Sequence, residues 1–132
     1  TIREEDYRSL RAALFSLDDI EGAAYLLCGR STGNDEFRLL VRSVIPVSPE
    51  HYLERRRDFL SLASASYTKI AKLAQKDNLS VLFAHSHPGG FLEYSPQDDR
   101  EELKLQDFFS SRVPDILHGS LVLNDNGIIG RI

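Results

Sequence analysis

One short stretch, which leads from a buried strand into a helix, constrains the fold of this chain more than any other. His85 and His87 follow the apolar run at 81–84, whose short length and preceding turn residues predict a buried strand. Side chains two positions apart on a strand point to the same face, so both imidazoles can reach one metal ion at about 2.0–2.1 Å. Ser95 and Asp98 then open a predicted helix. We therefore expect this helix start to supply a third ligand.

Each half of this stretch also has an ordinary structural explanation. Two histidines in alternate positions are more often hydrogen-bonded polar side chains than metal ligands. Ser95, Pro96 and Asp98 match a helix N-terminus, with serine as N-cap, proline at the first helical position and an acid that the helix dipole favours. The combined pattern H-x-H-P-x6-S-x2-D is far more specific than either half, and it favours a metal site.

The combined pattern resembles the JAMM motif of the JAB/MPN+ zinc metallo-isopeptidases, which it matches without a gap or substitution. That family also needs a glutamate far upstream, where a strand begins, and Glu21 in the segment E-G-A-A-Y-L-L-C-G fits this position. The resemblance implies three zinc ligands: His85, His87 and Asp98. It also implies that Glu21 is the general acid/base and that Ser95 stabilises the oxyanion.

The resemblance implies an α/β (α+β) fold of the MPN/JAB type, with a mixed, curved β-sheet flanked by helices and a cytidine-deaminase-like architecture. We expect one domain over residues 1–132, long enough for its own core. The lack of a starting methionine and an end that reads as an unfinished strand predict a domain excised from a longer chain. The patterns predict helices at 5–17, 60–76 and after Asp98, a strand or helical turn at 51–58, strands at 23–28, 36–47, 79–84, 118–123 and 127–132, and breaks at 18–22 and 31–35.

Composition narrows the classes of protein that this chain can belong to. A net charge of −4 argues against a dedicated nucleic-acid-binding protein, which normally carries a basic excess. The single cysteine, Cys28, cannot form an internal disulfide. No apolar run approaches the length of a membrane-spanning helix, and the N-terminus does not resemble a signal peptide. We expect a cytoplasmic protein with no nucleic-acid or membrane partner.

Several conspicuous residues allow two interpretations. Glu21 alone, at the mouth of a strand, would ordinarily be a solvated carboxylate. The arginines at 55–57 lie between Glu54 and Asp58, which favours a solvated face over a contact patch for an acidic partner. Three bulky residues between the ligands either contact a partner or fold inward: Phe91, Leu92 and Tyr94.

The remaining histidines and the cysteine have ordinary interpretations. His51 and His118 lie outside the ligand spacing, so we expect neither to bind the metal. Cys28 lies in an apolar strand, where a free cysteine behaves as a small hydrophobic residue. A thiol mechanism is therefore disfavoured.

JAMM enzymes cleave after the C-terminal glycine of ubiquitin or a ubiquitin-like protein, usually at an isopeptide bond to lysine. The short intervals of this chain resemble the compact prokaryotic JAB type, which occurs beside or fused to E1-like, ThiF-type adenylating enzymes in bacterial conjugation and antiviral operons. The resemblance therefore implies an isopeptidase with one zinc ion and a bound water. Its implied partners are the tail of a ubiquitin-like protein and an E1/ThiF-like domain.

Three other readings of the same motif stay open. A JAB peptidase of sulfur-carrier metabolism would release an amino acid from a carrier's C-terminal tail. A non-catalytic MPN scaffold would lack a ligand, and none is missing here. RadC-like proteins share a related metal motif and are linked to DNA repair, but the acidic balance and the lack of a helix-hairpin-helix segment argue against that assignment.

Overall fold

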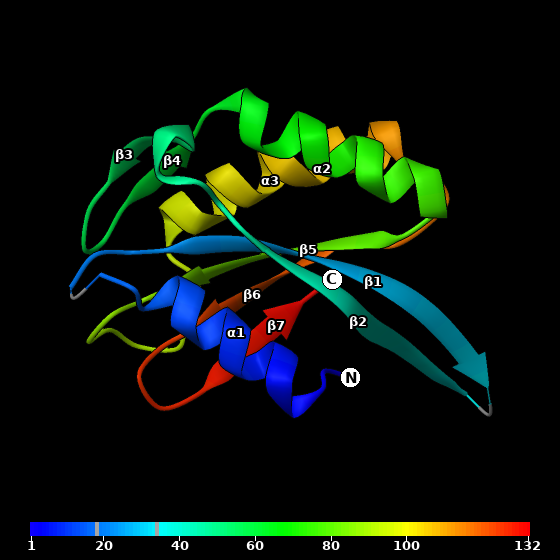
Figure 1. Cartoon of the computed structure of the whole chain (residues 1–132), viewed down its shortest axis with the longest axis horizontal. Helices are drawn as coiled ribbons and strands as arrows, with labels where there is room; N and C mark the ends of the chain where they lie inside the picture. Colours follow the sequence, from blue (N-terminus) through cyan, green and yellow to red (C-terminus); the bar gives the residue numbers. More distant parts are fainter. Residues whose placement is uncertain (18, 34) are drawn as a thin grey trace.

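The protein is described by a computed structural model that covers residues 1–17, 19–33 and 35–132 (Figure 1). Asp18, in the predicted break at 18–22, and Asn34, in the predicted break at 31–35, lie outside the described residues. The elements in chain order are α1 (Glu4–Leu14), β1 (Ala23–Gly33), β2 (Glu36–Pro46), the 3₁₀ turn η1 (Pro49–His51), β3 (Tyr52–Arg55), β4 (Leu60–Leu62), α2 (Ser64–Asp77), β5 (Ser80–Ser86), α3 (Pro96–Arg112), β6 (Gly119–Leu123) and β7 (Ile128–Arg131).

A curved five-stranded sheet in the order β2-β1-β5-β6-β7 forms the centre of the molecule (Figure 1). Strand β1 pairs antiparallel with both β2 and β5. Strands β5 and β6 are parallel, and β7 pairs antiparallel with β6. Helix α1 lies on one face of the sheet, and α2 and α3 lie on the other (Figure 1). The predicted fold class, a mixed sheet flanked by helices, is confirmed.

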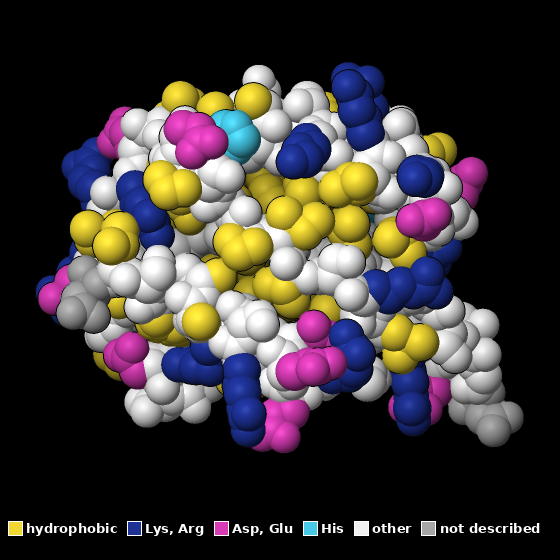
Figure 2. Space-filling view, viewed as in Figure 1, with side chains coloured by type: hydrophobic (Ala, Val, Ile, Leu, Met, Phe, Trp, Pro, Cys, Tyr) yellow, Lys and Arg dark blue, Asp and Glu magenta, His cyan; other side chains and the backbone are white. Residues whose placement is uncertain are grey.

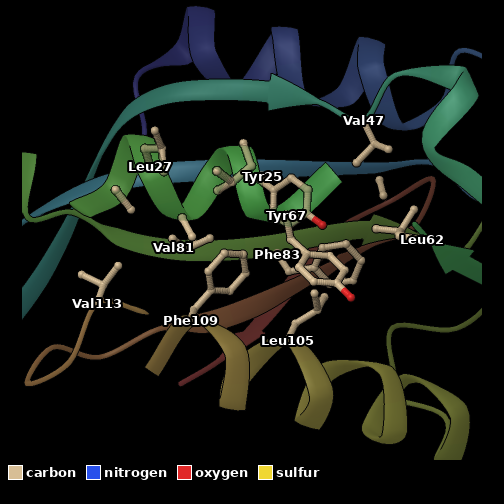
Figure 3. Close-up of a cluster of buried hydrophobic side chains, with 14 of the residues drawn as sticks. Tyr25, Leu27, Val47, Leu62, Tyr67, Val81, Phe83, Leu105, Phe109 and Val113 are labelled. Carbon is tan, nitrogen blue, oxygen red and sulfur yellow. The ribbon is translucent and has the colours of Figure 1, made fainter. Parts of the chain in front are cut away.

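Strand β1 is apolar throughout its first half because both of its faces are covered. Tyr25 and Leu27 belong to the core under α2 and α3, whereas Leu26 and Cys28 belong to the core under α1. Figure 3 shows the first of these cores, where the Tyr25 ring lies 5.6 Å from that of Phe83. Burying each such large side chain stabilises the fold by about 1.5–3 kcal/mol.

Two predicted helix boundaries are wrong. The helix predicted at 60–76 begins only at Ser64, because Leu60–Leu62 is strand β4, which pairs with β3. Leu60 and Leu62 are buried on either side of a partly exposed serine, which is a period of two and not of 3.6. The helix predicted at 5–17 ends at Leu14, and Leu17 is 46% exposed.

The end of α1 is fixed by a contact from a distant strand. The hydroxyl of Ser86, at the end of β5, donates a hydrogen bond to the Leu14 carbonyl at 2.9 Å and accepts one from the Gly22 N–H at 2.8 Å. The Leu14 carbonyl also lies only 2.6 Å from the place where a Cβ on Gly22 would stand. Any larger residue at 22 would therefore push the helix away from the sheet.

The strand predicted at 23–28 continues to Gly33 in the structure. Its last residues, Ser31–Gly33, are exposed, so they carry no apolar signal that sequence reasoning could use. They nevertheless pair with β2 through the register Thr32 opposite Phe37.

Hydrophobic side chains gather in the middle of the face shown in Figure 2, while basic and acidic side chains of the described residues alternate around its rim. None of the described helices is both long enough and apolar enough to cross a membrane.

Candidate metal centre

The register of two antiparallel strands brings Glu21 to the histidine pair. Ala23 of β1 lies opposite His85 of β5, and carrying this register two residues further places Glu21 opposite His87 on the same face of the sheet. The two strand ends are also joined beyond the ladder, since the Ser86 N–H donates to the Gly22 carbonyl at 3.0 Å. The Oε1 atom of Glu21 consequently lies 3.5 Å from Nε2 of His87.

Helix α3 brings Asp98 to the same place through its first turn. Ser95 is the N-cap, its hydroxyl accepts the Asp98 N–H at 3.0 Å, and Oδ2 of Asp98 accepts the Ser95 N–H at 2.8 Å. This reciprocal capping box holds the carboxylate at the helix start, with Pro96 at the first position. The ordinary capping interpretation of Ser95 and Asp98 is therefore confirmed, and capping itself directs the carboxylate toward the histidines.

Four side chains from three parts of the chain converge as a group that could hold a metal ion: Glu21, His85, His87 and Asp98, with one donor atom of each within 4.8 Å of the others. The two imidazole Nε2 atoms lie 3.2 Å apart. Asp98 lies 3.1 Å from His85 through Oδ1 and 3.1 Å from His87 through Oδ2. Ligands at about 2.0–2.1 Å from a tetrahedral ion stand about 3.3–3.4 Å apart, so these donors fit three corners of such a site.

The protonation of His87 suits a metal ligand. Its Nδ1 lies 3.1 Å from the Phe91 carbonyl oxygen, which can only accept a hydrogen bond, so Nδ1 carries the proton. The proton that Nε2 donates to Asp98 in the metal-free protein can then be lost to a metal ion, which would bind the lone pair of Nε2. Because the Phe91 carbonyl lies in the same loop, the loop between the ligands itself orients this imidazole.

Glu21 is only 2% exposed, so the solvated interpretation of this carboxylate is wrong. Its N–H donates to the Arg56 carbonyl at 2.8 Å, and its own carbonyl accepts from Nε of Arg55 at 2.7 Å. The β3–β4 hairpin, which includes these arginines, thus fixes the Glu21 backbone on both sides. Burial raises the pKa of Glu21 to about 8, although His87 beside it acts in the opposite direction.

Burial would also raise the pKa of Asp98, but hydrogen bonds from His85 and His87 lower it below its usual value. Through the same contact, Asp98 raises the pKa of His87 above its usual value. At neutral pH the centre therefore keeps one firmly ionised carboxylate beside the imidazoles and a second, Glu21, that can hold a proton.

The raised pKa of Glu21 predicts how the metal-free protein responds to pH. Between the ordinary value of 4.5 and about 8 the folded state retains a proton that the unfolded state has lost, so stability falls as pH rises through this range. In the presence of a chelator, Glu21→Gln should be more stable than the wild type at pH 8 by on the order of 3 kcal/mol. Denaturant unfolding at pH 4 should show no such difference, and equal stabilities at both pH values would contradict the prediction.

A cleft of about 490 Å³ opens over the cluster. It is lined by Glu21, His87 and Ser95 together with the hairpin residues Arg57 and Asp58 and the loop residues Pro88–Phe91 and Glu93. The Ser95 hydroxyl uses a lone pair for capping, so its own O–H is left to donate to a group in the cleft.

The three bulky residues of the loop, which the sequence leaves as either partner contacts or inward-folded side chains, differ in their environment. Phe91 is 79% exposed at the edge of the cleft. Tyr94 folds inward, where its hydroxyl donates to the Ser120 carbonyl at 3.1 Å and Arg131 lies over its ring at 3.7 Å. Leu92 packs beside Gly127, since a Cβ added to Gly127 would lie 2.9 Å from Cδ1 of Leu92.

The arginines at 55–57, read from the sequence as a solvated face, have three different environments. Arg55 binds the Glu21 carbonyl and stacks on Tyr52 at 4.2 Å, Arg56 pairs with Glu54 at 2.5 Å, and Arg57 lines the cleft. Sequence reasoning missed Arg55 and also Ser86, the buried residue between the two histidines. For Ser86 its place inside the motif is a signal, whereas nothing local identifies Arg55.

The two other histidines and the cysteine, for which we expect no role in the site, lie outside the group of four that could hold a metal ion. His118 is buried as a structural residue, with Nδ1 accepting the Val81 N–H at 2.9 Å and Nε2 donating to the Val113 carbonyl at 3.0 Å. Burial raises the pKa of Cys28 to about 12, so its thiol stays protonated. His51 ends the turn η1 and is outside the group as well.

Comparison with known protein families gives no match, and comparison with curated proteins gives none either. Among solved structures, the solution structure of protein DSY2949 from Desulfitobacterium hafniense is similar, with a TM-score of 0.62 and 19% sequence identity. The alignment covers 98% of this chain and 79% of that one. At this level of identity the likeness shows the fold alone.

Proposed function

We propose that this protein is a zinc-dependent peptidase of the JAMM type, which cleaves after the C-terminal glycine of a ubiquitin-like protein. The observation that carries the proposal is the convergence of two imidazoles and two carboxylates, one of them buried, beside an open cleft that Glu21 and His87 line. The donor set supports zinc in particular, because two histidines and one carboxylate are a common ligand set of catalytic zinc.

His85, His87 and Asp98 would hold the ion, and their single negative charge would leave the centre positive. When bound, zinc supplies a Lewis acid and lowers the pKa of its water to about 7. Glu21 removes a proton from the attacking water and later passes it to the leaving amine. Glu21 lines the cleft beside His87, so its carboxylate stands where it could accept and release this proton.

Ser95 stabilises the oxygen that becomes negative when the amide is attacked. Its hydroxyl faces the cleft from the N-cap of α3, and the capping box fixes its position. Loss of one such donor commonly costs about 2.7–4 kcal/mol of transition-state stabilisation.

The residues that line the cleft suit an extended peptide as substrate. One wall is the β3–β4 hairpin and the other is the loop that contains Gly89 and Gly90, where an approaching peptide backbone meets little side-chain bulk. A flexible tail that ends in glycines fits such a cleft. We place the reaction in the cytoplasm, with an E1/ThiF-like enzyme as the partner that activates the same ubiquitin-like protein.

The proposal is tested by elemental analysis together with a cleavage assay. The purified protein should contain one equivalent of zinc and should cleave a ubiquitin-like protein, encoded near it in the genome, at the bond after the terminal glycine of a C-terminal fusion. Removal of zinc by a chelator should abolish cleavage, and zinc should restore it. Zinc without cleavage of the fusion or of an isopeptide conjugate would favour a scaffold over an enzyme.

One observation favours a second function, the release of an amino acid from a sulfur-carrier tail. Among the described residues that line the cleft, Arg57 is the only lysine or arginine, and it has no carboxylate within ion-pair distance in that part of the chain. A guanidinium pairs well with the free α-carboxylate of a single leaving amino acid. A lysine leaving through its side chain would carry no carboxylate at that place.

Arg57 therefore predicts a preference that separates the two functions. If the leaving group is a free amino acid, a tail peptide that ends in a carboxylate should be cleaved about 10-fold faster than its C-terminal amide. Arg57→Gln should remove the difference, whereas Arg56→Gln, at the neighbour that pairs with Glu54, should retain it. Equal rates for both peptides in the wild type would leave the isopeptidase as the better proposal.

A further inference from the structure

One nitrogen of the proposed metal ligand His85 lacks a partner. His85 is 3% exposed, its Nε2 faces Asp98, and its Nδ1 is the buried side-chain atom that finds no hydrogen-bond partner within the described part of the chain. Leaving a buried donor or acceptor unsatisfied destabilises a protein, so such an atom normally has a partner. A histidine that binds metal almost always donates its second N–H to a carboxylate, a carbonyl or a water.

A small cavity beside His85 shares no lining residue with the open cleft. Its volume is about 10 Å³, which is about the room that one water needs. The wall combines apolar side chains with polar ones: Phe59, Leu60 and Phe83, and His85, Gln97, Asp98, Glu101 and Glu102. A cavity of this size with several polar groups in its wall is a place where one ordered water binds.

Glu101 is the carboxylate in this wall that is free to bind such a water. Its side chain is 24% exposed and its nearest ion-pair partner is Lys104, at 3.8 Å, which is beyond hydrogen-bond distance. Glu102, in contrast, is engaged by two hydrogen bonds of 2.8 Å from Arg131.

We infer that Glu101 is a positioning residue for the metal centre. It holds His85 through one water in the cavity that both residues line. The Nδ1–H of His85 donates to the water, and the water donates to the Glu101 carboxylate. This arrangement fixes the proton on Nδ1 and leaves the lone pair of Nε2 directed at the metal. The inference rests on the proposed metal centre, and it gives His85 an outer partner as the Phe91 carbonyl does for His87.

The inference is tested by zinc affinity, measured in competition with a chromophoric chelator, and not by turnover. Glu101→Leu removes the acceptor and should weaken zinc binding about 10- to 100-fold. Glu101→Gln retains an oxygen that accepts from the water, so it should lose less than about 10-fold. The matched control is Glu102→Gln, which lines the same cavity but engages Arg131, and it should stay within about 3-fold of the wild type.

A second readout identifies the proton itself. Nitrogen-15 NMR of the zinc-loaded wild type should show His85 protonated at Nδ1, with slow exchange of this proton with solvent. The exchange should become faster in Glu101→Leu, and circular dichroism should show an unchanged fold. If Glu101→Leu does not fold, the comparison of Glu101→Gln with Glu102→Gln decides.

The outcomes separate this inference from the proposed function. Zinc binding by the wild type that is unaffected in the Glu101 variants would overturn the inference and leave the metal centre standing. A larger loss in Gln97→Leu than in Glu101→Leu would overturn it in favour of the amide. A wild type that binds no zinc would overturn both.

Discussion

Glu21→Gln in the zinc-loaded protein is expected to lower the turnover of a ubiquitin-like fusion by about 10²–10⁴-fold and to leave zinc bound. Glutamine has nearly the same shape, but its amide can neither accept nor release the proton that the reaction transfers. The side chain is buried, and its backbone is fixed by the β3–β4 hairpin, so the substitution should leave the geometry of the cleft intact. Turnover should be measured with zinc content determined on the same sample.

The matched control for this prediction is Glu93→Gln. Glu93 also lines the cleft, but it is not in the group of four that could hold a metal ion. Turnover in this variant should stay within a few-fold of the wild type, because a solvated carboxylate at the rim contributes little. Turnover by Glu21→Gln at the native rate would show that another group acts as the base.

The grouping of three candidate metal donors could be predicted because each depends on a local rule. His85 and His87 share a face through the period of a strand, and Asp98 is placed by the N-terminal turn of a helix. Glu21 is expected at this site from the resemblance to the JAMM family, and the antiparallel pairing of β1 with β5 is what places it opposite His87. Spacing alone therefore accounts for His85, His87 and Asp98 but not for Glu21.

The parts that sequence reasoning missed depend on contacts between distant segments. Arg55 reaches the Glu21 carbonyl across the β3–β4 hairpin, and no local pattern marks that contact. Leu60–Leu62 is too short for its period to stand out from the helix that follows, and only its pairing with β3 makes it a strand. The position of Glu21 likewise depends on a distant segment, because the hairpin fixes its backbone on both sides.

His85→Ala, in contrast to Glu21→Gln, is expected to remove the metal itself. Loss of an outer-shell partner commonly weakens metal binding 10- to 100-fold, so loss of a direct ligand should exceed about 100-fold. The measurement is zinc content after dialysis, with affinity from chelator competition. His51→Ala, at a histidine outside the group of four, should bind zinc as the wild type does. Unchanged zinc content in His85→Ala would mean that the ion binds elsewhere.

Asp98→Asn separates metal binding from helix capping, the two tasks that this residue can perform. Asparagine keeps an oxygen that can accept the Ser95 N–H, so the capping box at the start of α3 should be retained. The start of α3 should therefore stay helical, which circular dichroism of the zinc-free protein checks, although that protein loses the contacts of the ionised carboxylate with His85 and His87. Zinc affinity should fall by about 100-fold or more, because the centre loses the ionised carboxylate that contacts both imidazoles. If both stability and zinc affinity stayed at the wild-type level, Asp98 would serve the helix alone.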